Sequence, residues 1–147
     1  MIALASDHAG FELKSAIRRY LDERGVAYND FGTHSQDSCD YPAYGLKAAQ
    51  AVANGQCERG ILVCGTGVGI GIAAGKVRGV RCVNCSEPYS AVLSRRHNDT
   101  NMLSLGARVV GQGLAITIVE QWLDATFEGG RHLDRIELIA KYESGGG

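Results

Sequence analysis

Residues 60–71 read GILVCGTGVGIG, and this stretch decides the fold that the sequence predicts. An apolar run of strand length, residues 60–64, passes directly into alternating glycines, and a helical segment follows. Glycine lets successive backbone N–H groups converge on one point, and the positive end of the next helix adds to them. Such a loop can stabilise a negative oxygen, either on a phosphate group or on an oxyanion that forms during a reaction.

Strand and helix patterns alternate along the rest of the chain. Further apolar runs of strand length lie at residues 1–6, 26–31, 80–84 and 102–105. Helical patterns lie at residues 13–25, 42–54, 86–97, 112–125 and 131–142. This alternation predicts an α/β protein with three αβα layers, a Rossmann-like open parallel sheet of about five strands with helices on both faces. Ligands of such sheets bind beyond the carboxyl ends of the strands, so residues 7–8, 65–69, 84–87 and 106–108 are candidates.

Length and composition limit the classes of function. A chain of 147 residues predicts one domain, residues 1–143, followed by a flexible glycine-rich tail, residues 144–147. A net charge of −1 argues against nucleic acid and membrane surfaces as partners. The sequence shows no secretory signal and no membrane-spanning run. Five cysteines, an odd number, favour free thiols and a cytoplasmic location.

The glycine loop is compatible with several known motifs. It is not a phosphate-binding P-loop, because that motif ends in Gly-Lys-Ser/Thr and residues 75–77 read Gly-Lys-Val. Gly69, Gly71 and Ala74 fit a dinucleotide fingerprint loosely, with Glu87 as a conceivable ribose ligand. A noncatalytic nucleotide- or phosphosugar-binding module therefore stays open. A simple turn that lets strand and helix pack closely stays open as well.

Cys64 ends the central strand at the mouth of the glycine loop. The helix dipole and nearby N–H donors would favour its thiolate form, which can act as a nucleophile or a general base. The alternative is a small buried hydrophobic residue. Cys82 and Cys85 have redox-motif spacing, but Cys82 lies in an apolar run and no second cysteine pair exists for zinc.

Basic side chains cluster in two later segments. Arg131 and Arg135 are spaced i, i+4 near a helix start, which suits a phosphate dianion or, alternatively, a solvated surface face. His97 near a helix end can serve as an acid, although Asn98 could simply turn the chain there. Asp7 follows the first strand, where an N-cap is the alternative. No histidine pairs with a carboxylate at a recognisable metal-ligand spacing.

Several segments together resemble a known enzyme family. They are SDHAGF (6–11), DYP (40–42), ILVCGTGVGIG (61–71), CSEPYS (85–90), LSRRHNDTN (93–101) and GGRH (129–132). In this order and spacing they resemble type B ribose-5-phosphate isomerases, a family that also holds galactose-6-phosphate isomerase subunits. The resemblance implies interconversion of ribose 5-phosphate and ribulose 5-phosphate in the pentose phosphate pathway. A six-carbon substrate, allose or galactose 6-phosphate, is the alternative.

The resemblance also implies roles for individual residues. Cys64 would be the base that moves a proton between C2 and C1, His97 the ring-opening acid, and Thr66 a proton shuttle. Asp7 would assist at the ring-opening end. The substrate-binding residues would be Asp7, His8, Tyr41, Gly65, Thr66, Gly67, Val68, Gly69, Asn98, Arg108, Arg131 and Arg135. Some family members use a glutamate just after the loop, but Ile70 stands there, so the chain matches the cysteine branch.

Cofactors and partners follow from the same resemblance. No cofactor and no metal ion are expected, and the ligand is a small sugar phosphate. The expected assembly is a homodimer, possibly a tetramer, with sites shared between subunits. His97 and Asn98 would then reach Cys64 of a partner chain.

Overall fold

All five strands predicted from the sequence are present, and they pair in parallel in one sheet. The computed structural model describes residues 1–145. The sheet order is β2-β1-β3-β5-β4, from β1 (Ile2–Ser6), β2 (Tyr28–Asp30), β3 (Arg59–Cys64), β4 (Cys82–Asn84) and β5 (Met102–Gly106). The helices are α1 (Phe11–Arg24), α2 (Tyr41–Ala53), α3 (Val68–Gly75), α4 (Pro88–Asn98), α5 (Gln112–Asp124) and α6 (Arg131–Glu143). The predicted fold class is therefore confirmed.

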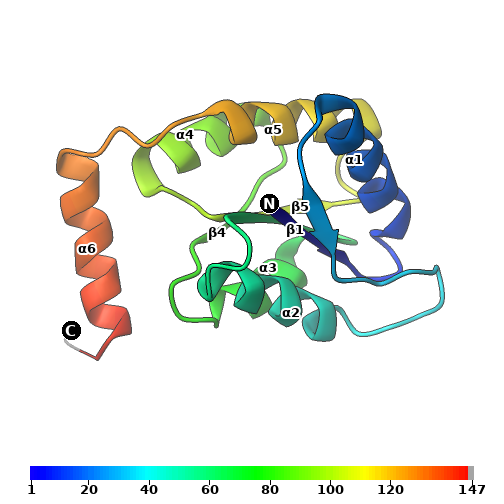
Figure 1. Ribbon diagram of the computed structural model, residues 1–147, viewed down its shortest axis with the longest axis horizontal. Helices are drawn as coiled ribbons and strands as arrows, with labels where there is room; N and C mark the ends of the chain where they lie inside the picture. Colours follow the sequence, from blue (N-terminus) through cyan, green and yellow to red (C-terminus); the bar gives the residue numbers. More distant parts are fainter. Residues whose placement is uncertain (146–147) are drawn as a thin grey trace.

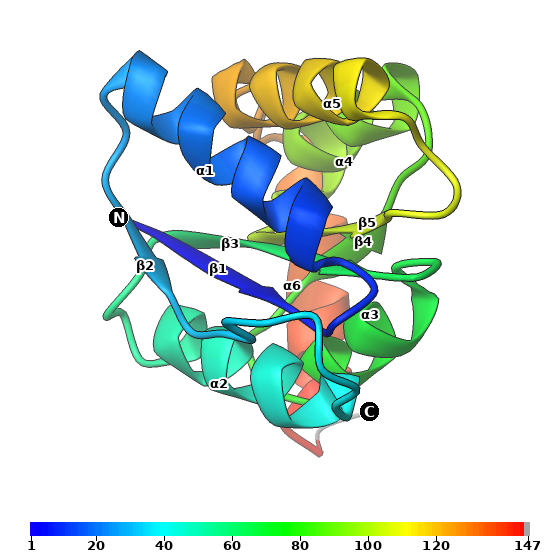
Figure 2. The ribbon, with the colours of Figure 1, turned by 90° about the vertical axis from the view of Figure 1, so that its right-hand side faces the viewer.

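Helices cover both faces of the sheet and form two cores. Helices α1, α4 and α5 lie on one face, and α2 and α3 lie on the other (Figures 1 and 2). Successive strand residues point to opposite faces, so each central strand contributes to both cores. In β3, Ile61 and Val63 pack toward α1 and α5, whereas Leu62 and Cys64 pack toward α2 and α3. The side chain of Cys64 therefore lies on the α2–α3 side.

Local signals in the sequence explain where most helices begin and end. Gly25 ends α1 with a φ of 72°, and a proline stands in the first turn of α2. The alternative of a turn at Asn98 is wrong: α4 continues through Asn98, and Asp99 turns the chain with a φ of 45°. Ion pairs of the Asp99 carboxylate with Arg81 and Arg95 hold it in this left-handed conformation.

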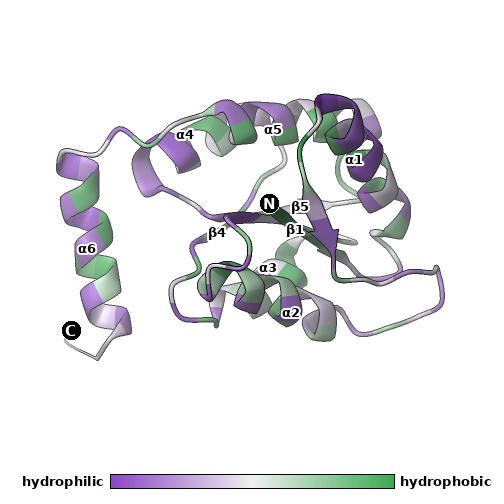
Figure 3. Cartoon of the chain, viewed as in Figure 1, coloured by the Kyte–Doolittle hydropathy of each residue, from purple (hydrophilic) through white to green (hydrophobic). Residues whose placement is uncertain are grey.

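Helix α6 stands apart from the three layers at one side of the molecule (Figure 1). It contacts α4, and the Gly79 N–H donates to the Glu143 carboxylate at 2.6 Å. Hydrophobic positions recur along α6 (Figure 3). Three of these residues are exposed: Leu138 by 67%, Ile139 by 57% and Tyr142 by 77%. Residues 144–145 of the predicted tail form a turn after α6, and residues 146–147 lie outside the described residues. Within residues 1–145, no helix is both long and apolar enough to cross a membrane.

Candidate active site

The loops after β1 and β3 diverge at the centre of the sheet. These strands are neighbours, with Ser6 paired to Val63, and the sheet extends through β2 on one side and β5 on the other. In open parallel sheets, such a reversal of strand order leaves a crevice at the carboxyl ends where ligands bind. Asp7 and His8 follow β1, and Cys64 ends β3. The structure therefore brings these three predicted site residues to the same crevice.

Hydrogen bonds to its carbonyl groups orient the main chain of the glycine loop. The Ala107 N–H donates to the carbonyl of Cys64 at 2.9 Å, and the Arg108 N–H donates to the carbonyl of Gly65 at 3.0 Å. The C=O and the following N–H of a trans peptide point in opposite directions. The N–H groups of Gly65 and Thr66 are therefore turned away from the β5 side.

The next peptide of the loop is oriented by a side chain. Asn84 at the end of β4 donates from Nδ2 to the carbonyl of Thr66 at 3.3 Å. On the opposite side of the same peptide, the Gly67 N–H donates to Sγ of Cys64 at 3.1 Å. Gly67 has a φ of 78°, and a Cβ there would lie 2.3 Å from Nδ2 of Asn84, so this position requires glycine. The sequence placed Asn84 in the candidate range 84–87 but did not predict this contact with the loop.

Cys64 is buried, with 5% of its surface exposed, but its sulfur lies against the glycine loop. A main-chain N–H aimed at sulfur stabilises negative charge there. The thiol thus contacts both the buried cluster on the α2–α3 side and the main chain of the glycine loop.

Cys82 and Cys85 carry the two thiols that the redox-pair alternative requires. Burial raises the pKa of Cys82 to about 12 and that of Cys85 to about 11, so both stay protonated near neutral pH. Cys82 packs toward α2 and α3, whereas Cys85 lies in the core on the opposite face. This arrangement contradicts the redox-pair alternative, because the two thiols do not face each other.

Asp7 and His8 are held by the segments around them. Oδ1 of Asp7 accepts the Gly10 N–H at 3.0 Å, but Gly10 is the N-cap of α1, so Asp7 orders the turn before the helix and the N-cap alternative is wrong. Nδ1 of His8 lies 3.2 Å from the backbone nitrogen of Cys39, which donates its proton. Neutral His8 must therefore carry its proton on Nε2, where it can donate to an anion or a hydroxyl group. Cys39 has this backbone role, which no sequence signal indicated.

Tyr41 and Arg108 also lie against the glycine loop. A Cβ at Gly69 would stand 2.6 Å from the Tyr41 ring, and one at Gly65 would stand 3.2 Å from an Arg108 guanidinium nitrogen. The structure therefore brings together part of the predicted site, here called the glycine-loop site. It comprises Asp7, His8, Tyr41, residues 64–69 and Arg108.

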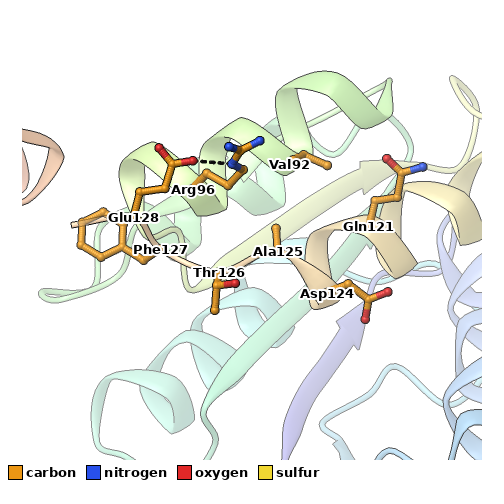
Figure 4. A pocket seen from close by; sticks show the side chains of 8 residues that line it. All are labelled: Val92, Arg96, Gln121, Asp124, Ala125, Thr126, Phe127 and Glu128. Atoms are coloured by element: carbon orange, nitrogen blue, oxygen red, sulfur yellow. Dashed lines mark hydrogen bonds and ion pairs between the residues drawn. The ribbon is translucent and has the colours of Figure 1, made fainter. Parts of the chain in front are cut away.

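The predicted residue His97 lies in a second group, here called the histidine cluster, which also contains Arg96, Glu128 and His132. The rings of His97 and His132 stack with centroids 4.2 Å apart. Oε1 of Glu128 lies 3.8 Å from Nε2 of His97 and 3.7 Å from Nε2 of His132. Arg96 binds the other carboxylate oxygen and lowers the pKa of Glu128 (Figure 4). Burial, followed by the nearby charges of His97 and Arg131, lowers the pKa of His132.

The histidine cluster corrects the expectation that no histidine pairs with a carboxylate at metal-ligand spacing. Ligand atoms of His97, Glu128 and His132 lie within 4.8 Å of one another. Glu128 and His132 are only four residues apart, whereas His97 joins them through tertiary structure, since α4 lies beside the linker between α5 and α6. Arg96 already neutralises the carboxylate, and Arg131 follows closely in the chain, so this surface suits an anion better than a metal ion.

The same linker borders a groove of about 520 Å³, shown in Figure 4. Val92 and Arg96 of α4, Gln121 and Asp124 of α5, and residues 125–128 line it. No residue of the glycine-loop site is among them. The groove separates the linker from α4 and α5 and does not extend to Cys64.

Within one chain, the glycine-loop site lies at the carboxyl ends of the strands and the histidine cluster lies near their amino ends. Helix α4 runs back from the carboxyl end of β4, so its last residues, His97 and Asn98, lie near the amino ends of the strands. There the Gly60 N–H donates to the Asn101 carbonyl. Cys64 lies four residues further along β3, or about 13 Å at ~3.3 Å per residue.

Arg131 and Arg135 lie on the same side of the molecule as the histidine cluster. They occupy the first turns of α6, directly after the linker that carries Glu128. Both side chains are exposed, and neither pairs with a carboxylate among residues 1–145. The structure thus leaves both guanidinium groups accessible to an anion but does not place them beside Cys64 of the same chain.

An open parallel α/β sheet with a thiol, oriented main-chain amides and basic side chains at its crevice defines an enzyme of the Rossmann-like class that acts on small phosphorylated ligands. A family model described as Ribose/Galactose Isomerase matches residues 2–139. The chain therefore belongs to the ribose/galactose isomerase family, and it is a sugar-phosphate isomerase. This result overturns the alternative of a noncatalytic binding module.

Individual relatives agree with this assignment. Ribose-5-phosphate isomerase B of Escherichia coli is 57% identical and covers 97% of this chain and 95% of the relative. D-erythrulose-4-phosphate isomerase of Pectobacterium atrosepticum is 41% identical, with coverage of 97% and 94%. The solved structure of Clostridium thermocellum ribose-5-phosphate isomerase B superposes with a TM-score of 0.97 at 52% identity, covering 98% of this chain and 97% of that one.

Proposed function

We propose that the chain interconverts ribose 5-phosphate and ribulose 5-phosphate through an enediolate. The observation that carries this proposal is the position of Sγ of Cys64, 3.1 Å from the Gly67 nitrogen in an oriented glycine loop. Similarity to ribose-5-phosphate isomerase B of Escherichia coli supports the choice of sugar. A Mycoplasma genitalium relative, 40% identical with a TM-score of 0.93 and coverage of 97% and 95%, was solved with bound ribulose-5-phosphate.

The proposed chemistry needs one base and one oxyanion site. The Cys64 thiolate removes the proton from C2 of the open-chain sugar and returns it to C1. The N–H groups of residues 65–69 stabilise the enediolate oxygen. Thr66 Oγ1 accepts the Val68 N–H at 3.1 Å, and its own hydroxyl proton remains able to move between the two substrate oxygens.

The rest of the reaction needs the residues of the histidine cluster and α6. We assign ring opening to His97, assisted by Asp7, and phosphate binding to His8, Arg131 and Arg135. Within one chain, Cys64 lies at the carboxyl ends of the strands and His97 near their amino ends. Each active site must therefore combine Cys64 of one copy with His97 of a second copy. Asn98 at the end of α4 would contact the substrate from the same copy as His97.

A homodimer is the assembly that this requires. The exposed hydrophobic side chains of α6, at Leu138, Ile139 and Tyr142, provide apolar surface for such an interface. The described cysteines are all free, which agrees with action in the reducing cytoplasm.

An assay over a panel of sugar phosphates tests the substrate. Ribose 5-phosphate should give the highest kcat/KM when compared with allose 6-phosphate, galactose 6-phosphate and D-erythrulose 4-phosphate. The chelator EDTA should leave the rate unchanged, because the proposed proton transfer uses no metal ion. A higher kcat/KM on a six-carbon or four-carbon substrate would replace ribose 5-phosphate with that sugar.

Mixing two inactive variants tests the shared site. Cys64→Ala and His97→Asn should each be inactive alone, but a mixed dimer contains one intact site. After unfolding and refolding together at equal amounts, about a quarter of the wild-type activity should return, since half of the dimers are mixed. The same treatment of each variant alone is the control. Failure of the mixture to recover activity, with dimers present by light scattering, would contradict shared sites.

A further inference from the structure

The side chain of Lys14 carries a charge into the protein interior. Its exposed fraction is 0%, and Nζ donates to Asp30 Oδ1 at 2.7 Å and to the Thr33 carbonyl at 2.5 Å. Burial lowers the pKa of Lys14, and the bond with Asp30 opposes that effect. A buried ion pair is weak support for stability, because an apolar residue of similar size often serves as well. We therefore consider which segments of the chain the ammonium group holds in position.

Lys14 holds the start of the segment 31–40, which connects β2 to α2. Asp30 Oδ1 also accepts the Gly32 N–H at 2.9 Å. The Thr33 N–H donates to the carbonyl of Ser6 at 2.7 Å, at the end of β1. The Lys14 ammonium on α1 thus joins the end of β2 to Thr33, and the Thr33 N–H in turn binds the strand that leads directly to Asp7 and His8.

The far end of this segment reaches the glycine-loop site. There the Cys39 N–H donates to Nδ1 of His8, and Tyr41 begins α2 with its ring against Gly69. Residues 34–38 between the two ends are exposed. The position of the Cys39 N–H therefore depends on how firmly the segment is anchored at Thr33.

We propose that Lys14 is a positioning residue for substrate binding, which rests on the proposed function of the glycine-loop site. By anchoring residues 31–33, Lys14 keeps the Cys39 N–H on Nδ1 of His8 and keeps the Nε2 proton of His8 directed at the substrate. Lys14 itself does not touch the substrate. Charged groups facing its ammonium are the carboxylate of Asp30 and, beyond that carboxylate, the guanidinium of Arg18.

Two variants test the proposal. Lys14→Met keeps the chain length without the donor, and Lys14→Met/Asp30→Asn also removes the charge left unpaired. Both should raise KM for ribose 5-phosphate about tenfold or more and change kcat less than about threefold, because small misplacements of binding groups are costly. In ¹⁵N NMR spectra of histidine-labelled protein, the His8 ring should shift from a single Nε2–H form toward a mixture of tautomers.

Arg18→Met is the matched control. Arg18 pairs with the other oxygen of Asp30, at 3.3 Å, from the exposed side of α1. This variant should leave KM and the His8 ring signals as in the wild type. Lys14→Arg should restore part of the wild-type KM, because it returns a donor.

The NMR readout separates this proposal from the proposed function. Unchanged His8 signals in the folded double variant would overturn the positioning role, even if its melting temperature falls. An altered His8 tautomer would support the role even in a protein that does not isomerise ribose 5-phosphate. Titration with inorganic phosphate, followed at His8, then gives the loss of anion affinity without any turnover.

Discussion

The glycine-loop site and the histidine cluster are built in different ways. The first is held by hydrogen bonds to main-chain carbonyls, made by Ala107, Arg108 and Asn84 at the carboxyl ends of neighbouring strands. The second is held by side chains of α4 and the linker before α6, around the Glu128 carboxylate. The first arrangement follows from the sheet itself. The second lies at the amino ends of the strands, remote from Cys64 of the same chain.

The largest effect should come from Cys64 in the glycine-loop site. Cys64→Ala should lower kcat by about two or more orders of magnitude, the usual cost of losing a general base. Cys57→Ala is the control, because Cys57 is a buried thiol before β3, at the other edge of the sheet. A folded Cys64→Ala enzyme with full activity would remove the proposed mechanism.

The next effect concerns the histidine cluster. His97→Asn should reduce turnover of the cyclic sugar by roughly 100-fold, as loss of a general acid does. Turnover of an open-chain substrate should fall much less, because no ring has to open. Comparing ribose 5-phosphate with ribulose 5-phosphate, in the two directions, measures this difference. Equal losses in both directions would argue against a ring-opening role.

A smaller effect is expected at the side-chain support of the glycine loop. Asn84→Ala removes the donor to the Thr66 carbonyl and should lower kcat about fivefold, since one neutral hydrogen bond contributes about 1 kcal/mol. Ser104→Ala is the matched variant. It removes the Ser104 hydroxyl that contacts Asn84 Nδ2 but leaves the bond to Thr66. A wild-type kcat in Asn84→Ala would show that the β5 contacts alone orient the loop.

The smallest effect should appear in the pH dependence of stability. The pKa of His132 is lowered in the folded chain, so the unfolded chain binds its proton first as pH falls below about 6.5. Wild-type stability should therefore decrease from pH 7.5 to pH 5.5 more than that of His132→Asn. Melting temperatures at the two pH values test this. An equal decrease in both proteins would contradict the lowered pKa.

Much of the glycine-loop site could be predicted from the sequence. Its residues directly follow strands, and the carboxyl ends of parallel strands necessarily share one edge. The order of strands along the chain is therefore enough to place Cys64, Asp7 and His8 together. Asn84 lies in the candidate range 84–87, but its contact with the loop was not predicted, because that contact depends on the distance between β4 and the loop. The catalytic roles themselves stay predictions until they are measured.

The histidine cluster could be predicted only in part. His97 is recognisable as a basic residue near a helix end, as are Arg131 and Arg135 beside the cluster on α6. Their relation to Glu128 depends on a linker that brings α6 beside α4, and no short-range pattern encodes that path. The position of the left-handed turn at Asp99 instead of Asn98 also depends on tertiary contacts, with Arg81 and Arg95.

By itself, the sequence determined the order of strands and helices, the parallel sheet and the glycine loop after Cys64. The strands and helices follow from hydrophobic periodicity, and the loop follows from the ability of glycine to adopt a positive φ, such as the 78° of Gly67. Both are local properties of the chain. Tertiary structure alone decided that His97 and Cys64 lie at opposite edges and that Lys14 anchors the segment beside His8. Those relations depend on distances between elements remote in sequence, and packing of the whole chain sets such distances.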